Sequence, residues 1–267
     1  MVVGAAWLAG SVPFSNLAAR HRADVDLRDV GSGTVSGTAL YEVAGFGPLA
    51  VAGACDVAKG VVGPLLAGRD RPVLGAVAAT AGVAGHNWSP WLRGAGGRGL
   101  SVAFGAFLPL AWPGTVVLAL GLAGGRLRRQ SGLGTFLGAA LVVPVVARTH
   151  GRSGAVAGAG IVGALLAKRM AGNQPPARRT AAVYLHRLVF DRDPGEGAAF
   201  VSDRSERTMS TVRGSAHVNE RSERTKSTVP SHSARVSERS ERAMSTVPSR
   251  SARRADRSWR ASRRVRQ

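Results

Sequence analysis

Residues 99–125 read GLSVAFGAFLPLAWPGTVVLALGLAGG and contain no charged side chain. A helix of about 20 such residues is long enough to cross the hydrocarbon layer of a membrane. A helix on the surface of a soluble bundle would carry polar or charged residues along one face, and this stretch offers none that is charged. The stretch therefore predicts that the chain enters a membrane here.

Similar apolar stretches, poor in charge, recur on both sides of this one. They lie at residues 2–19, 43–67, 72–86, 131–147 and 153–167. All are rich in Gly and Ala, which allow helix backbones to approach closely in lipid. We therefore predict an all-α, polytopic bundle of about seven short spans within residues 1–195, with the N-terminus outside.

The number of spans depends on the middle of the 99–125 stretch. Pro113-Gly114 is a turn signal, so the stretch is either one span or a hairpin of two short spans. The excess of Lys and Arg that marks the cytoplasmic side favours the hairpin. The resulting seven-span arrangement puts ten basic residues inside, namely Arg20, Arg22, Arg28, Arg93, Arg98, Arg126, Arg128, Arg129, Lys168 and Arg169. It leaves four outside, namely Arg69, Arg71, Arg148 and Arg152.

Residues 196–267 have a different composition, dominated by Ser, Arg, Glu and Thr. Residues 200–267 hold 17 Lys and Arg against 7 Asp and Glu, with few large apolar side chains. Such a segment cannot bury enough apolar surface to fold, so we predict a disordered basic tail on the cytoplasmic side. It is either simply solvated or attracted to anionic lipid headgroups, and we expect no nucleic-acid partner. Cys55 is the single cysteine of the chain, which excludes an intrachain disulfide.

Two of the predicted inside loops have a composition that suits an anion. The first runs from Arg20 to Glu42 and the second from Gly85 to Gly99, and both combine glycines and hydroxyls with arginines. Glycines let backbone N–H groups converge on a phosphate, and the helix that follows adds a favourable dipole. A guanidinium such as that of Arg98 can hold two phosphate oxygens at once. The alternative is that both loops are flexible connectors whose arginines only follow the charge bias.

Four short motifs carry a resemblance to a known family. In chain order they are Gly10-Ser11-Val12-Pro13-Phe14, Asp26-x-Arg28-x-x-Gly31-Ser32-Gly33, Asp56-x-x-Lys59-Gly60, and Gly85-His86-Asn87 followed by Gly96-Gly97-Arg98-Gly99. Their order and spacing resemble those of the bacterial acyl-phosphate:glycerol-3-phosphate acyltransferases, over roughly residues 1–195. Each motif is weak by itself, and their combination is specific.

The resemblance implies transfer of a fatty acyl group from acyl-phosphate to glycerol 3-phosphate, giving lysophosphatidic acid in the first step of phospholipid synthesis. It implies no cofactor and no metal, and it places the protein in the cell's inner (plasma) membrane with the active loops on the cytoplasmic side. Carried over by position, the catalytic residues are Ser32, His86 and Arg98. The phosphate-binding residues are Arg28, Gly31, Ser32, Gly33, Thr38, Gly96, Gly97, Arg98 and Gly99.

Three further residues have two possible roles each. Asp56 and Lys59 are expected to form a buried pair, which is either functional or purely structural. His86 serves either as a proton relay or as a hydrogen-bonded anchor of its loop. Because acyl-phosphate is already an activated mixed anhydride, the reaction needs positioning and charge stabilisation rather than a protein nucleophile.

The chain departs from the family pattern in its first and third motifs. Thr34 and Ala39 replace two asparagines, and Glu42 replaces a basic residue, which reverses the charge there. In the third motif Ala181 and Tyr184 replace His and Asn, while Arg187 and Leu188 are kept and Asp191-Arg192-Asp193 stands where the family has Gly-x-Glu. A second hypothesis is therefore a catalytically impaired member that acts as a membrane binding or scaffold protein. A small transporter is a third, although the sequence shows no internal repeat of spans.

Overall fold

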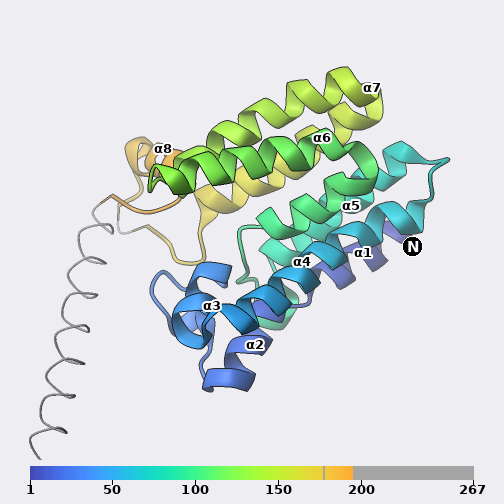
Figure 1. The fold of residues 1–267 in the computed structure, drawn as a ribbon. Coiled ribbons are helices and arrows are strands. Elements are labelled where there is room, and N and C mark those ends of the chain that lie inside the picture. The colour runs from blue at the N-terminus through green and yellow to red at the C-terminus, as the bar shows by residue number, and fades with distance from the viewer. Residues whose placement is uncertain (177, 195–267) are drawn as a thin grey trace, which may run out of the picture. The chain divides into compact units, whose positions relative to one another are not determined.

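The computed structural model describes residues 1–176 and 178–194, and within these ranges the regular structure is entirely helical (Figure 1). The elements are α1 (Val2–Ser11), α2 (Phe14–Ala23), η1 (Leu27–Asp29), α3 (Gly37–Ala44), α4 (Phe46–Ala67), α5 (Pro72–Asn87), η2 (Pro90–Leu92), α6 (Leu100–Leu127), α7 (Ser131–Ala171) and α8 (Ala181–Phe190). The prediction of an all-α fold is confirmed. The predicted tail, residues 196–267, lies outside the described residues.

Four segments of the described chain are long and apolar enough to cross a membrane. They are Val2–Ala23, Phe46–Ala67, Leu100–Leu127 and Ser131–Ala171. The first consists of α1 and α2, which are separated at Val12-Pro13 because a proline ring removes a backbone donor and disturbs the helical path. The other three are the single helices α4, α6 and α7.

Helix α6 doubles back on itself near its middle. Ala111 has a non-helical backbone (φ −165°, ψ 75°), and the Thr115 hydroxyl donates to the Phe104 carbonyl oxygen at 3.0 Å. In a straight helix these two residues would lie about 16 Å apart along the axis. The chain turns two residues before Pro113-Gly114, so the hairpin predicted from that turn signal is present.

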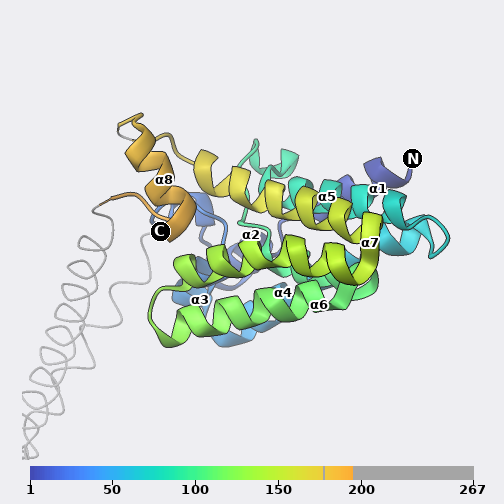
Figure 2. The same cartoon turned by 90° about the horizontal axis from the view of Figure 1, so that it is seen from above.

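Helix α7 doubles back in the same way at Gly151. This residue has φ 58° and ψ −139°, a conformation that glycine adopts readily. The Arg169 Nη2 atom donates to the Thr135 hydroxyl at 2.6 Å, although the two residues would be about 50 Å apart along a straight helix. Figures 1 and 2 both show the two arms of α7 side by side. The break separates the predicted stretches 131–147 and 153–167. The total of seven spans and the outside N-terminus stay predictions.

Glycines set the distance between the crossing helices. A Cβ atom on Gly60 of α4 would overlap the Val102 carbonyl oxygen of α6, and one on Gly105 of α6 would overlap the Val57 carbonyl of α4. These obstacles are backbone atoms, which cannot swing aside as a side chain can. Helices α4 and α6 therefore touch backbone to backbone, as small residues allow in membrane bundles.

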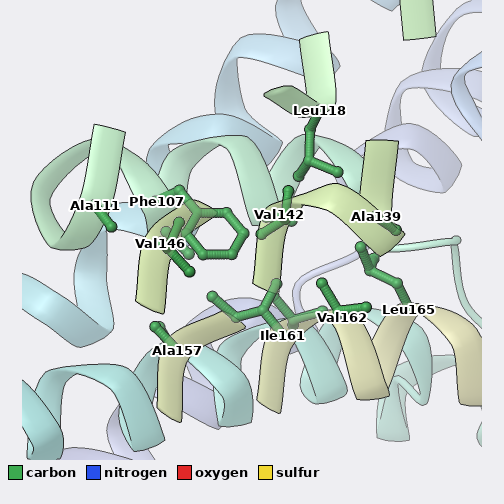
Figure 3. Close-up of a cluster of buried hydrophobic side chains, with 14 of the residues drawn as sticks. Phe107, Ala111, Leu118, Ala139, Val142, Val146, Ala157, Ile161, Val162 and Leu165 are labelled. Carbon is green, nitrogen blue, oxygen red and sulfur yellow. The ribbon is translucent and has the colours of Figure 1, made fainter. Parts of the chain in front are cut away.

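The largest apolar cluster fills the space between the arms of α6 and α7 and the face of α5. Phe107 is its largest fully buried side chain and contacts the turn region at Gly114. Figure 3 shows Phe107 beside Val146 of the first arm of α7, with Ile161 of the second arm below them. This cluster joins the two arms of each hairpin, so the beginning of α6 and the end of α7 are held at one end of the bundle, where the polar loops lie.

The two hairpins make the sidedness of the loops testable. In a Cys55→Ala background, we expect Arg93→Cys and Arg128→Cys to react with a membrane-impermeant maleimide only after the membrane is opened. Asp70→Cys lies in the loop between α4 and α5. It should react in intact spheroplasts, since in the predicted orientation α4 crosses to the outside and α5 returns to the inside. All three positions are exposed. Labelling of Arg128→Cys in intact spheroplasts would contradict the α6 hairpin as a pair of spans and with it the predicted orientation.

Candidate functional site

Arg98 stands at the start of α6, and the glycines around it fix its position. Gly99 is the N-cap residue of α6 with φ 75°, and a side chain there would collide with the Asn87 amide oxygen. A Cβ atom on Gly97 would collide with the His86 ring. The loop glycines thus let the chain lie directly on the end of α5. In this position the Arg98 side chain points between the loops at that end of the bundle.

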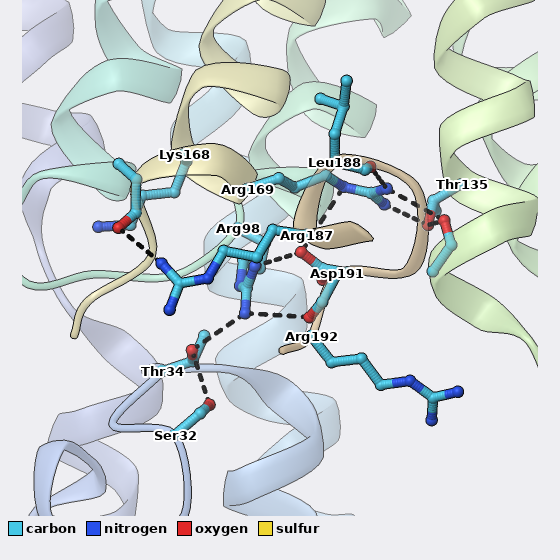
Figure 4. A network of polar contacts seen from close by, with 12 residues as sticks. Ser32, Thr34, Arg98, Thr135, Lys168, Arg169, Arg187, Leu188, Asp191 and Arg192 are labelled. Atoms are coloured by element: carbon cyan, nitrogen blue, oxygen red, sulfur yellow. Dashed lines mark hydrogen bonds and ion pairs between the residues drawn. The ribbon is translucent and has the colours of Figure 1, made fainter. Parts of the chain in front are cut away.

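Three groups surround the Arg98 guanidinium (Figure 4). Its Nη1 atom forms an ion pair with the Asp191 carboxylate. Its Nη2 atom donates to the Thr34 hydroxyl at 3.3 Å and to the Asp191 carbonyl oxygen at 3.4 Å. The Ser32 hydroxyl donates to that of Thr34 at 3.0 Å. Arg98 therefore joins the first loop to the end of α8, across 93 residues of sequence.

Arg169, near the end of α7, approaches the same carboxylate from the other side. Its Nε atom lies 3.7 Å from the Asp191 Oδ1 atom. Its Nη groups donate to the Thr135 hydroxyl at 2.6 Å, to the Gly132 carbonyl at 3.0 Å and to the Leu188 carbonyl at 3.1 Å. Burial raises the pKa of the Asp191 carboxyl above its ordinary value, and the two neighbouring guanidiniums oppose this effect.

Asn173 holds the two loops and α7 together. Its amide nitrogen donates to the carbonyl oxygens of Gly33 and Gly96 at 2.9 and 2.8 Å. Its amide oxygen accepts from the Gly96 N–H at 3.2 Å and from the Lys168 ammonium at 2.6 Å. One side chain therefore makes four hydrogen bonds that join both loops to the end of α7.

Two cavities meet at these residues. The smaller has a volume of about 60 Å³, and the larger has about 580 Å³. Both are lined by the same five residues, which we call the shared wall: Ser32, Thr34, Arg98, Arg169 and Asp191. The larger cavity continues from this wall along apolar side chains, including Phe46, Leu49, Leu100, Phe104, Leu122 and Leu166. A lining with both charged and apolar side chains suits a molecule with an anionic head and an apolar chain.

The predicted Asp56–Lys59 pair is present in α4. The Lys59 Nζ atom lies 2.8 Å from the Asp56 Oδ1 atom and donates to the Val12 carbonyl at 2.6 Å, at the break between α1 and α2. The His86 Nδ1 atom lies 3.9 Å from the same Asp56 oxygen. Asp56 and His86 line the larger cavity, whereas Lys59 does not. Lys59 therefore has a structural role at the break, and Asp56 and His86 face the space where a ligand fits.

The structure brings some of the predicted phosphate-binding residues to the cavities and leaves others away from them. Ser32, Thr38, Arg98 and Gly99 line the larger cavity. Arg28 lines neither cavity and instead donates to the Asp26 carboxylate at 3.0 and 2.7 Å, which lowers the pKa of that carboxyl.

The glycines among the predicted phosphate-binding residues mainly shape the loops. Gly31 and Gly33 have φ values of 54° and 67° at the turn of the first loop. The N–H groups of Gly96 and Gly97 donate to the Asn173 side chain and to the His86 carbonyl, so they are not free for an anion. The predicted cradle of backbone N–H groups is therefore not formed at these two positions.

The departures from the family pattern have different structural consequences. Glu42 is exposed on α3 and lines neither cavity, so its carboxylate is not part of the shared wall. In α8, Ala181 is exposed and Tyr184 is half-buried, while the kept Arg187 is buried. Arg187 pairs with Asp193, which lowers the pKa of that carboxyl, and donates to the Gln174 carbonyl at 3.2 Å. The kept half of the third motif therefore anchors α8.

The roles of Arg169, Asn173 and Asp191 were not predicted from the sequence. Arg169 counted only as a basic residue at the end of a span, and Asn173 belongs to none of the motifs. Asp191 stood at a glycine of the family pattern without an assigned function. Within residues 1–176 and 178–194, no cluster of three or more His, Cys, Asp or Glu side chains could hold a metal ion.

Comparison with known proteins agrees with this architecture. The family model described as glycerol-3-phosphate acyltransferase matches residues 1–174. The chain belongs to this family. The glycerol-3-phosphate acyltransferase of a Synechococcus species is 36% identical over 170 residues, which cover 62% of this chain and 84% of that protein.

Two more relatives of the glycerol-3-phosphate acyltransferase family match over shorter stretches. The protein of Parasynechococcus marenigrum is 39% identical over 115 residues, covering 42% of this chain and 54% of its own length. That of Thermus thermophilus is 44% identical over 106 residues, covering 39% and 52%. The matched region thus spans about half the length of these two relatives.

Two solved structures share the fold of this glycerol-3-phosphate acyltransferase family member. The crystal structure of PlsY, an integral membrane glycerol 3-phosphate acyltransferase in its glycerol 3-phosphate form, superimposes with a TM-score of 0.60 at 20% identity, covering 72% of this chain and 92% of that one. The lysophosphatidic acid form gives a TM-score of 0.56 at 18% identity, covering 63% and 86%. At these identities the likeness establishes a common fold.

Proposed function

We propose that the protein transfers a fatty acyl group from acyl-phosphate to the 1-hydroxyl of glycerol 3-phosphate, giving lysophosphatidic acid at the cytoplasmic face of the plasma membrane. The observation that carries this proposal is the charged wall of a cavity whose lining also includes apolar side chains. Arg98 and Arg169 supply two fixed positive charges there, and Ser32 and Thr34 supply hydroxyls. Glycerol-3-phosphate acyltransferases are the family to which the chain belongs.

In this mechanism the phosphate of the acceptor binds Arg98 and Arg169, which make charge-assisted hydrogen bonds to its oxygens. The acyl chain of the donor extends along the apolar part of the larger cavity, past Phe46 and Phe104. Such an arrangement holds two anionic substrates at one place and turns an encounter of two molecules into a reaction within one complex.

The chemical step needs no covalent enzyme intermediate. The acceptor hydroxyl oxygen forms a bond to the acyl carbonyl carbon, and the carbon–oxygen bond to the donor phosphate breaks. The phosphate leaves with the bonding electron pair and takes up the proton lost by the hydroxyl. His86 lines the same cavity 3.9 Å from Asp56, so we assign it to relaying that proton.

The test is an assay of the purified full-length protein with acyl-phosphate and glycerol 3-phosphate. We expect lysophosphatidic acid and inorganic phosphate to appear in equal amounts, and no product when acyl-coenzyme A replaces acyl-phosphate. If neither acyl-phosphate nor acyl-coenzyme A gave any product, in a preparation that still binds glycerol 3-phosphate, the chain would bind the acceptor without acylating it.

A further inference from the structure

Two guanidiniums of the shared wall converge on a single carboxylate. Asp191 pairs with Arg98, and its Oδ1 atom lies 3.7 Å from the Nε atom of Arg169. Carboxylate and phosphate are the two anions whose planar oxygen pairs match a guanidinium fork. Asp191 therefore interacts with the same two guanidiniums that, in the proposed function, bind the phosphate of the acceptor.

The backbone at this position does not require an aspartate. Asp191 follows α8 as its C-cap residue with φ 62°, a left-handed conformation in which glycine has no steric cost. The family pattern that the chain resembles has a glycine at this point of its third motif. The backbone at this position therefore favours glycine, and the Asp191 carboxylate is not needed for the local fold.

The Asp191 side chain has space to leave the arginines. It lines both the small and the large cavity, so it lies at the boundary between them. Helix α8 is held independently by Arg187, which donates to the Gln174 carbonyl at 3.2 Å, and by the contact of Arg169 with the Leu188 carbonyl at 3.1 Å. Rotation about the Cα–Cβ bond of Asp191 can therefore release the Nη1 atom of Arg98 without moving the helix, while its Nη2 atom keeps the contact with the Asp191 carbonyl.

We propose that Asp191 is an internal competitor for the substrate phosphate and so sets the affinity of the acceptor site. This inference rests on the proposed function. In the empty site the Asp191 carboxylate neutralises one of the two guanidinium charges. A phosphate dianion brings two charges to the two arginines, whereas a carboxylate ligand brings one and merely replaces Asp191.

The size of the effect follows from the share of molecules in which Asp191 holds Arg98. A ligand that binds only the open form has an apparent dissociation constant raised in proportion to the loss of that form. A partly buried, charge-assisted contact of ordinary strength keeps the open form at about a tenth of the molecules. Removing the carboxylate should therefore tighten phosphate binding about tenfold.

The test compares Asp191→Asn and Asp191→Gly with the wild type in the purified full-length protein. Isothermal titration with glycerol 3-phosphate and with inorganic phosphate should give about tenfold tighter binding for both variants. Asp70→Asn makes the same change of net charge in the exposed loop between α4 and α5, and should leave both affinities unchanged.

Equal or weaker phosphate binding in both Asp191 variants would overturn the inference and assign Asp191 to positioning Arg98 instead. The glycine variant fits the backbone at φ 62°, so it guards against a loss of binding caused by misfolding, which thermal unfolding of each variant checks. The outcome is separate from that of the acylation assay. If the wild type turns over but the variants gain no affinity, the competitor role of Asp191 is rejected and the acyltransferase activity stands. If the variants bind phosphate more tightly but the wild type shows no turnover, only the proposed activity is rejected.

Discussion

Replacing Arg98 with alanine should weaken the apparent affinity for glycerol 3-phosphate by roughly ten- to a hundredfold. The substitution removes a charge-assisted contact worth about 1.5–3 kcal/mol, and about 1.4 kcal/mol corresponds to a factor of ten. Among the described residues, it also leaves Arg169 as the one arginine beside the Asp191 carboxylate. The net charge of the shared wall therefore falls from positive to zero. The measurement is the KM for glycerol 3-phosphate at saturating acyl-phosphate.

Two further variants separate a specific contact from a general effect of charge. Arg98→Lys keeps the charge at this position, so most of the activity should remain. Arg93→Ala removes the same charge from the same loop, but Arg93 is exposed and lines neither cavity. If Arg93→Ala raised the KM as much as Arg98→Ala, the loop would act through its overall charge and the assignment of Arg98 would fail.

Replacing Gly60 with alanine should lower the stability of the folded protein by about 3 kcal/mol, the upper end of the usual range for overpacking. The new methyl group would overlap the Val102 carbonyl oxygen and lie 2.9 Å from the Ala106 backbone nitrogen. Since these are backbone atoms of α6, the two helices must separate to admit the group. Thermal unfolding in detergent, followed by circular dichroism, measures the effect.

Gly53→Ala is the matched control, because Gly53 lies seven residues earlier on the same helix and its added Cβ would meet no atom within 4 Å. There the exchange should raise stability slightly, since alanine favours the helix over glycine by up to about 1 kcal/mol. Opposite signs for the two variants support close contact of α4 and α6 at Gly60. Similar losses of stability in both would mean that the helix tolerates no substitution, independent of its contact with α6.

The third motif shows how a family pattern can lose one part and keep another. Arg187 holds α8 through Asp193 and the Gln174 carbonyl, and this anchoring half is kept. Ala181 and Tyr184, where the pattern has His and Asn, line neither cavity. The shared wall is built without them, from Arg98, Arg169 and the hydroxyls of the first loop.

The sequence by itself determined the class of fold, the family and part of the site. Apolar stretches without charge are a local property, and they already require helices in a membrane. The turn at Pro113-Gly114 predicted the α6 hairpin, since proline and glycine act on the backbone within a few residues. Motif order indicated Ser32, His86 and Arg98, all three of which line the larger cavity.

Only the tertiary structure decided which groups meet at the site. Arg98 contacts a carboxylate 93 residues away, and Arg169 contacts Thr135 only because α7 reverses at Gly151. Asn173 bonds to both loops although it stands in no motif. Such contacts depend on the packing of whole helices, and hydrophobic pattern and residue spacing carry no information about them. For the same reason Arg28, which the resemblance placed among the phosphate-binding residues, lines neither cavity, because a local pattern fixes a residue's place in the chain but not the direction of its side chain.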